Sequence, residues 1–302
     1  MPHSTRFNRM NLPLISYLIA LLCIVVFYFQ YKNENLLEQD ISAFCSEIKS
    51  VASDVSAMNK MVTDNNLCRL MIKRIEQRPD LTVSALIHRY FWFEDLTPGQ
   101  FSALTAYVEQ HHADYAKKYT ASLKKDLVYF PQSADPLKML TSALAHGDIW
   151  HLIGNLIFFL AFAPAIEIVM ARAWAFLGIC IVIIVSSSLA YSASVWLGQE
   201  ALPALGLSGL VMGMIGLFAA LMPREKIRVF VWILIYFGNV YIPAWLLALW
   251  FIGWDSLNLL LGTGDPAINL VAHVAGAVTG YVLGYVCLKK RIKDPAIYLP
   301  RQ

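Results

Sequence analysis

Six apolar stretches, each near 20 residues long, constrain this chain more than any other feature of its sequence. A helix needs about 20 predominantly apolar residues to cross the hydrocarbon core of a bilayer. Of the 302 residues, 58% are hydrophobic and 15% are charged, whereas a soluble domain carries about 25% charged residues. We therefore predict an all-α protein that crosses the membrane six times. The expected spans are Leu12–Gln30, His151–Met170, Trp174–Leu197, Gly206–Met222, Val229–Gly253 and Ile268–Leu288.

Positively charged residues in the short loops predict the orientation of these spans. Lys and Arg accumulate in cytoplasmic loops. Here they precede the first span and follow the second, fourth and sixth, whereas the two short loops on the opposite side have neither and carry Glu200, Asp255 and Asp265. Both termini, residues 1–11 and the basic tail 289–302, are therefore expected in the cytoplasm.

The first span is expected to be a retained signal anchor. Arg6 and Arg9 precede it, as they would in a secretory signal peptide, but the apolar run ends in Phe27-Tyr28-Phe29-Gln30 without a small-x-small cleavage site. The chain also lacks a targeting presequence rich in Arg and Ser. These features favour a multi-pass protein of a bacterial inner (plasma) membrane over an organellar one.

The orientation brings several polar side chains to one depth. The second, fourth and sixth spans begin at the outer face, where His151 and Asn155 open the second, Ser208 the fourth and His273 the sixth. At 1.5 Å per residue, these four residues lie within roughly 10 Å of depth. Ionisable side chains inside a membrane are costly and are usually functional, so we expect them to form one site.

Ser208 and His273 are the candidate catalytic pair. A histidine beside a serine is the smallest set that makes a hydroxyl nucleophilic. The serine lies in Gly206-Leu207-Ser208-Gly209 and the histidine in Ala272-His273-Val274-Ala275-Gly276, so both have glycine-rich surroundings. This pairing predicts peptide-bond chemistry within the membrane.

A candidate oxyanion hole accompanies the pair. The tetrahedral intermediate of acyl transfer needs hydrogen-bond donors aimed at its oxyanion. His151 and Asn155 are four residues apart, so their side chains lie on one helix face. The His151 imidazole, the Asn155 amide and the backbone N–H of Ser208 are the expected donors.

Glycines recur along the spans that carry the catalytic pair. Gly206, Gly209 and Gly213 lie in the fourth span, and Gly276 and Gly280 lie in the sixth. Small residues spaced by four let membrane helices pack with close backbones. One interpretation is that these are packing motifs alone. Close packing at this end also brings the serine hydroxyl within reach of the imidazole.

Residues 31–135 form a large polar insert between the first two spans. They hold most of the 21 acidic residues and are expected to be a helical extracytoplasmic domain. Thr97-Pro98-Gly99-Gln100 predicts a helix start. An apolar seam with heptad spacing predicts a further helix that packs against a second helix or against a partner. Cys45 and Cys68 are a candidate disulfide if the outside is oxidising. The seam consists of Ile41, Phe44, Ile48, Val51, Val55, Met58 and Val62.

Other chemistries find little support in the sequence. No His-Glu-x-x-His zinc motif occurs, and the match of Gly262-Thr263-Gly264-Asp265 to an aspartyl-protease motif has no second aspartate within a span. No phosphate-binding loop or nucleic-acid signature occurs. We therefore expect no metal, no cofactor and no nucleic-acid partner.

These residues resemble the rhomboid family of intramembrane serine proteases. The second-span motif of the family resembles His146-x4-His151-x3-Asn155, its nucleophile motif resembles Gly206-Leu207-Ser208-Gly209, and its sixth-span motif resembles Ala272-His273-x2-Gly276-x3-Gly280. Glu167 resembles the glutamate that commonly ends the second span of the family. The resemblance covers the first span and residues 136–288, which would be the catalytic core, and leaves the insert unexplained.

The resemblance implies a fold, a reaction and a class of substrate. The fold is a six-helix bundle with a short central fourth helix and a water-filled cavity. The reaction uses a Ser–His dyad without an aspartate, with Ser208 as nucleophile and His273 as base and then acid. His151, Asn155 and the Ser208 backbone would form the oxyanion hole. The substrates are single-span membrane proteins in the lipid bilayer.

Two positions depart from the family pattern, and two rival functions stay open. Leu137-Lys138 stand where Trp-Arg is common, and Met212 stands where some members have a tyrosine. One rival is a catalytically silent rhomboid-like protein that binds membrane clients. The other is a transporter or channel, although the chain shows no inverted repeat.

Overall fold

A computed structural model describes residues 12–51, 65–78, 81–90, 97–119, 121–233, 236–263 and 268–288. The chain divides into two compact units. The first, which we call the bundle unit, comprises Met1–Val26 and Tyr129–Gln302, and the second, the insert unit, comprises Phe27–Val128. The basic residues expected at the two ends of the chain, together with Val55, Met58 and Val62 of the seam, lie outside the described residues.

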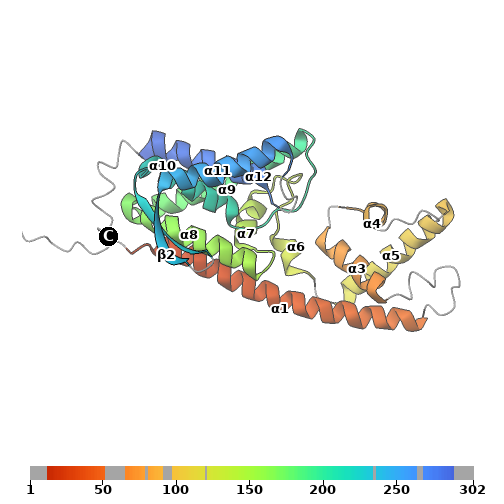
Figure 1. Cartoon of the computed structure of the whole chain (residues 1–302). Helices are drawn as coiled ribbons and strands as arrows, with labels where there is room; N and C mark the ends of the chain where they lie inside the picture. The colour runs from red at the N-terminus through yellow and green to blue at the C-terminus, as the bar shows by residue number, and fades with distance from the viewer. Residues whose placement is uncertain are drawn as a thin grey trace, which may run out of the picture. The chain divides into compact units, whose positions relative to one another are not determined.

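Four helices are long and apolar enough to cross a membrane. They are α1 (Leu14–Val51), α8 (Ile149–Met170), α9 (Ala173–Trp196) and α11 (Ala244–Leu261) (Figure 1). Two further apolar helices are shorter: α10 (Ser208–Leu221) and α12 (Leu270–Val282). A π-helical segment, η2 (Leu283–Leu288), continues α12.

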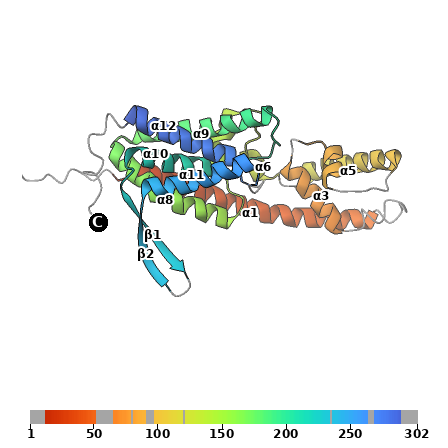
Figure 2. The same ribbon diagram turned by 45° about the horizontal axis from the view of Figure 1, so that its top comes forward.

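The expected fifth span is wrong over its first half. Strand β1 (Lys226–Ile233) pairs antiparallel with β2 (Tyr236–Pro243), and helix α11 begins only after Pro243. Figure 2 shows this hairpin extending away from the helices. An apolar run of 4–8 residues suits a strand as well as a helix, and β-branched and aromatic residues favour the strand. Within the described residues, the fold is therefore mostly helical, as expected, with one β-hairpin that was not expected.

Helix α10 lies at the centre of the bundle unit. Every residue from Leu210 to Leu221 is buried, and α8, α9, α11 and α12 all pack against it. Its 14 residues span about 21 Å, at 1.5 Å per residue. A helix that is apolar all round and surrounded by other helices does not need to reach both surfaces of a bilayer by itself.

The first helix is fixed to the second long helix by a carboxylate. Glu167 of α8 accepts hydrogen bonds from the backbone N–H of Ile15 at 2.9 Å and of Ser16 at 2.8 Å, and from the Ser16 hydroxyl at 2.7 Å. Helix N-termini leave unpaired N–H groups and favour negative charge. Glu167 therefore caps α1 from a neighbouring helix.

The insert unit is helical over most of its described residues. It contains the later part of α1, followed by α3 (Asn65–Gln77), α4 (Val83–Tyr90), α5 (Pro98–Lys118) and α6 (Leu123–Leu127). The predicted helix start at Thr97-Pro98 is confirmed by α5. The first helix does not end at Gln30 but continues to Val51.

The apolar seam of α1 packs inside the insert unit. Ile41 and Phe44 are buried in a cluster with Ile72 of α3 and Tyr115 of α5, and the rings of Phe44 and Tyr115 lie 5.4 Å apart. The interpretation that the seam packs against helices of its own chain is therefore confirmed for this part.

The cysteines of the insert unit form a disulfide. Cys45 and Cys68 are bonded, with Cα atoms 5.8 Å apart and a sequence separation of 23 residues. The bond joins α1 to α3 beside the seam cluster. The hypothesis that these two cysteines pair is thus confirmed, and such bonds persist in oxidising compartments.

Candidate active site at the head of helix α10

Ser208 is the first residue of α10, and the loop before it has a backbone that requires glycine. Leu207 precedes the helix without a side-chain cap. Gly206 has φ of +117°, and a Cβ added there would lie 2.7 Å from Cε1 of His151. Both the positive φ and the close ring exclude a larger residue. The loop thus brings its backbone directly against the imidazole of His151.

Three hydrogen-bonded contacts hold this loop. The Gly206 N–H donates to the Ser142 carbonyl of α7 (Pro136–Leu144) at 2.9 Å. Ala204 pairs with Tyr129 in an isolated antiparallel bridge of two hydrogen bonds. The Tyr191 hydroxyl of α9 donates to the Leu202 carbonyl and accepts from its N–H. The position of Ser208 is therefore fixed by three separate parts of the bundle unit.

Helices α10 and α12 approach so closely that their backbones touch. A Cβ added to Gly276 would lie 2.2 Å from the Gly209 carbonyl oxygen, and one added to Gly280 would lie 1.9 Å from that of Gly213. No side chain fits at either position of α12 without separating the helices. Because Gly209 follows Ser208 and Gly276 is three residues after His273, the close contact lies at the end that carries both residues.

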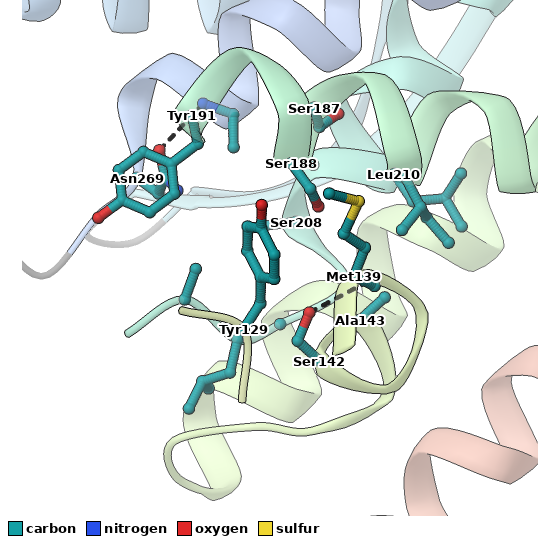
Figure 3. Close-up of a pocket in the computed structure, with 16 residues that line it drawn as sticks. Tyr129, Met139, Ser142, Ala143, Ser187, Ser188, Tyr191, Ser208, Leu210 and Asn269 are labelled. Atoms are coloured by element: carbon teal, nitrogen blue, oxygen red, sulfur yellow. Dashed lines mark hydrogen bonds between the residues drawn. The ribbon is translucent and has the colours of Figure 1, made fainter. Parts of the chain in front are cut away.

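A cavity of about 50 Å³ opens beside Ser208 (Figure 3). One water needs a cavity volume of roughly 10–15 Å³, so this cavity holds about three or four waters. Serine hydroxyls and the Asn269 amide join apolar groups in its wall. Four helices and two loops contribute the lining, which includes Tyr129, Met139, Ala143, Ser187, Ser188, Tyr191, Gly206, Ser208, Asn269 and Ala272.

His273 lies in the first turn of α12, next to the cavity-lining Ala272. Its Nδ1 is 2.8 Å from Oδ2 of Asp255 on α11, and both side chains are largely buried. A carboxylate only accepts hydrogen bonds, so Nδ1 carries the proton and Nε2 of the neutral ring is the free acceptor. No hydrogen bond joins Ser208 to His273 in the described part of the chain, and such bonds are often long in unliganded sites.

The placement of Asp255 corrects one expectation. The sequence predicted this residue in a loop, whereas the structure places it inside α11. Its carboxylate contacts the histidine there, a contact that the sequence did not predict. An aspartate in an otherwise apolar helix was the signal that could have found it.

His151 has the opposite tautomer. Its Nδ1 accepts the Gly147 N–H at 3.4 Å, so the neutral ring carries its proton on Nε2. That nitrogen is 2.9 Å from the position of a Cβ at Gly206, two residues before Ser208. Asp148 caps α8 and accepts from the His151 N–H at 2.9 Å. The ring therefore presents a donor toward the loop that ends at Ser208.

Asn155 contacts the backbone of His151, and His146 contacts its ring. The Asn155 amide donates to the His151 carbonyl at 2.8 Å, one helical turn away. The His146 ring packs edge-on against that of His151, with centroids 5.2 Å apart. Burial and the neighbouring His151 lower the pKa of His146 to about 4, so it stays neutral. Neither Asn155 nor the imidazole of His151 belongs to the cavity lining that the described residues form.

Comparison with known proteins identifies the bundle unit. The Rhomboid domain family model matches residues 134–290, which is more than half of the chain. The chain belongs to the rhomboid family. With its apolar helices, it is an integral membrane protein.

A curated relative belongs to the same family. The chain is similar to Rhomboid protein 1, mitochondrial, of Saccharomyces cerevisiae, with 27% identity over 181 residues. The aligned stretch covers 58% of this chain and 47% of the yeast protein. The chain thus spans about half the length of the relative that it matches.

The rhomboid match contains the candidate site residues but not every residue that holds them. Ser208, His273, His151 and Asn155 lie within 134–290. Tyr129, which pairs with the loop before Ser208, lies before it, and so does the insert unit. Sequence reasoning did not find Tyr129 or Tyr191, because their contacts join residues far from any motif.

Proposed function

We propose that this rhomboid protein is an intramembrane serine endopeptidase. It hydrolyses peptide bonds in or near the transmembrane segment of single-span membrane proteins. The observation that carries the proposal is the position of Ser208, at the head of a buried helix, beside a cavity large enough for several waters and against the helix that carries His273.

In this mechanism His273 acts first as base and then as acid. Its Nε2 accepts the proton of the Ser208 hydroxyl as the oxygen attacks the carbonyl carbon of the scissile bond. The imidazolium then donates that proton to the nitrogen of the leaving amine as the C–N bond breaks. A water from the cavity then attacks the acyl carbon while Nε2 of His273 takes one of its protons. The imidazolium returns that proton to Oγ of Ser208 as the ester C–O bond breaks, which releases the new carboxyl group and restores Ser208.

The oxyanion of each tetrahedral intermediate needs donors beside the nucleophile. The Ser208 backbone N–H lies at the start of α10, where a helix leaves its first N–H groups unpaired. The Nε2–H of His151 is aimed at the adjacent loop. Asn155 is the third proposed donor. Its amide carries a second N–H beside the one bonded to the His151 carbonyl.

The cavity supports a preference for a small residue at the cleavage position. Its volume of about 50 Å³ is bounded by Met139, Ala143 and two tyrosines, and close-packed walls do not yield easily to a larger group. We propose that Ala, Ser or Gly side chains enter it and that aromatic side chains do not.

The disulfide supports a topology for this reaction. Because Cys45–Cys68 is bonded, we propose that the insert unit faces an oxidising space, which is the periplasmic or outer side of a bacterial plasma membrane. Both termini are then cytoplasmic. Residues 31–135 would be available there to select a substrate or an extracytoplasmic partner.

A serine-directed probe tests the proposal directly. The purified protein in detergent is treated with a fluorophosphonate, and the adduct is located by mass spectrometry. We expect labelling at Ser208 that is lost in the His273→Ala variant. In parallel, Ser208→Ala is expected to abolish cleavage of a single-span reporter, whereas Ser188→Ala, which removes another serine from the same cavity, retains it.

The rival function is a silent rhomboid-like protein that binds membrane clients without cutting them. It predicts no adduct on folded protein and no cleavage by any variant, although a client is still bound. Undiminished cleavage by Ser208→Ala would instead show that the nucleophile has been assigned to the wrong residue.

A further inference from the structure

We infer that Asp255 is a positioning residue for His273, so that the site operates as Ser208, His273 and Asp255 in series. The inference rests on the proposed function and deepens it. Its basis is the 2.8 Å contact between Nδ1 of His273 and Oδ2 of Asp255. It differs from a two-residue site in that a third group holds the base in position and stabilises the positive charge that the base acquires.

The location of Asp255 argues against an incidental contact. It is the one charged residue among the 18 of α11, and a carboxylate inside a spanning helix is costly unless it is paired. The side chains of His273 and Asp255 are 15% and 18% exposed. Two largely buried groups at hydrogen-bond distance, on different helices, restrain each other more than a surface pair does.

Capping does not explain the contact. The carboxylate lies within α11, six residues before its last residue, Leu261, so it caps neither end of its own helix. Helix α12 has a separate cap, because the Asn269 side chain accepts the Ala272 N–H at 3.0 Å. Asp255 therefore caps neither end of α11, and the N-terminus of α12 has a cap of its own.

The contact controls the proton on the imidazole. With Nδ1–H donated to Asp255, the lone pair of Nε2 is the one that receives the Ser208 proton. The imidazolium formed in that step keeps Nδ1–H, and the carboxylate beside it stabilises the positive charge. Asp255 itself takes up no proton, and the proton on Nε2 passes to the leaving amine.

His151 makes the assignment sharper because it carries the opposite tautomer. Its Nδ1 is an acceptor for Gly147 N–H, whereas Nδ1 of His273 is a donor to Asp255. One ring therefore offers a proton from Nε2 and the other offers a lone pair there. A site that needs one donor and one base gains the donor from one imidazole and the base from the other.

Replacing Asp255 by Asn tests this role with little change in shape. A hydrogen bond to a charged group contributes about 10- to 100-fold to an equilibrium or a rate, so we expect kcat for a single-span reporter to fall by about that factor. KM is expected to change less than about threefold. The second-order rate of fluorophosphonate labelling is expected to fall by the same factor as kcat. The thermal unfolding of Asp255→Asn is expected to be unchanged. A residue that only stabilises the fold would not lower kcat and the labelling rate in parallel without also changing thermal unfolding.

The matched control lies one turn away on the same helix. Asn258→Ala removes a polar side chain whose hydrogen bonds are local. Its amide donates to the Trp254 carbonyl and accepts from the Thr263 hydroxyl. We expect its kcat and labelling rate to match those of the unaltered protein. Full activity of Asp255→Asn, or an equal loss in Asn258→Ala, overturns the inference.

A spectroscopic measurement on the unaltered protein does not depend on whether a variant folds. In protein with ¹⁵N-labelled histidine, the His273 signals, assigned by their loss in His273→Gln, are expected to show the proton on Nδ1. The His151 signals are expected to show it on Nε2. A proton on Nε2 of His273 overturns the inference. If the unaltered protein neither cleaves the reporter nor reacts with the fluorophosphonate, the proposed function has failed. If Ser208→Ala still cleaves, the nucleophile assignment has failed. If Ser208→Ala is inactive and Asp255→Asn is fully active, only this inference has failed.

Discussion

Gly206→Ala is a sharp test of how the loop before Ser208 builds the site. The substitution has two separate costs. A residue other than glycine at φ of +117° is strained, by about 1–3 kcal/mol. The new Cβ also lies 2.7 Å from Cε1 and 2.9 Å from Nε2 of His151, so the ring must move.

The ring has little freedom to move without loss. Its Nδ1 accepts the Gly147 N–H, and its edge packs against His146. A displacement that relieves the contact breaks one of these and turns Nε2 away from the loop. Misplacing a catalytic group by about 1 Å costs about 10²-fold in rate, and losing one oxyanion donor costs about 10²–10³-fold. We therefore expect the kcat of Gly206→Ala to fall by about 10²-fold or more.

Gly198→Ala separates the two costs. Gly198 also has a positive φ, +105°, but nothing lies within 4 Å of its added Cβ. Both variants are expected to lower the thermal unfolding midpoint, Gly206→Ala by at least as much as Gly198→Ala, and only Gly206→Ala is expected to lose activity. The assay is cleavage of a single-span reporter by purified protein, with thermal unfolding measured in parallel. Equal losses of activity in both variants, or full activity of Gly206→Ala, would refute the role given to the His151 position.

Two further predictions concern the insert unit. The 23-residue separation of Cys45 and Cys68 implies that the disulfide stabilises this unit by about 3 kcal/mol. In the Cys45→Ser, Cys68→Ser double variant, the unit should therefore become sensitive to protease at a lower temperature. A reductant should have the same effect on the unaltered chain but none on that variant. Burial raises the pKa of Glu76, but the hydrogen bond from His112 and the charge of Lys125 outweigh it and leave the pKa below its usual 4.5. The unit should therefore lose stability as pH falls below about 4.5, measured by proteolysis against pH; Glu76→Gln should weaken that dependence and Glu109→Gln should not.

Hydropathy predicted much of the bundle because its signal is local. The expected spans His151–Met170 and Trp174–Leu197 differ from α8 and α9 by at most two residues at either end. The same reasoning gave a wrong prediction for the first half of the run from Val229 to Gly253. The β-branched and aromatic residues there are as apolar as those of a spanning helix, so hydropathy alone does not show that they form strands. Only their pairing with a second strand distinguishes the two, and pairing is not visible in composition.

The candidate site was predicted in part for the same reason. Motifs identified Ser208, His273 and His151, because each has a characteristic local sequence. Asp255 was assigned to a loop, because the expected span ended at Gly253. Its partner, His273, is 18 residues away in the sequence. Tyr129 and Tyr191 act through contacts with the loop near Ala204 and Leu202, which no periodicity encodes. Local patterns therefore predict the candidate reacting groups, whereas the residues that hold them depend on the tertiary fold.

In the proposed function, the anchored loop also accounts for a reactive serine below the membrane surface. Helix α10 extends about 21 Å, some 10 Å less than the hydrocarbon core of a typical bilayer, so in our proposal the chain before Ser208 continues below the membrane surface without helical hydrogen bonds. Irregular backbone is tolerated there only where protein or water satisfies its polar groups. Ser142 accepts the Gly206 N–H, and both the N–H and the carbonyl of Ala204 and of Leu202 are paired by Tyr129 and Tyr191. The contacts that fix Ser208 are thus the same ones that make a short, water-facing helix start possible inside the bundle.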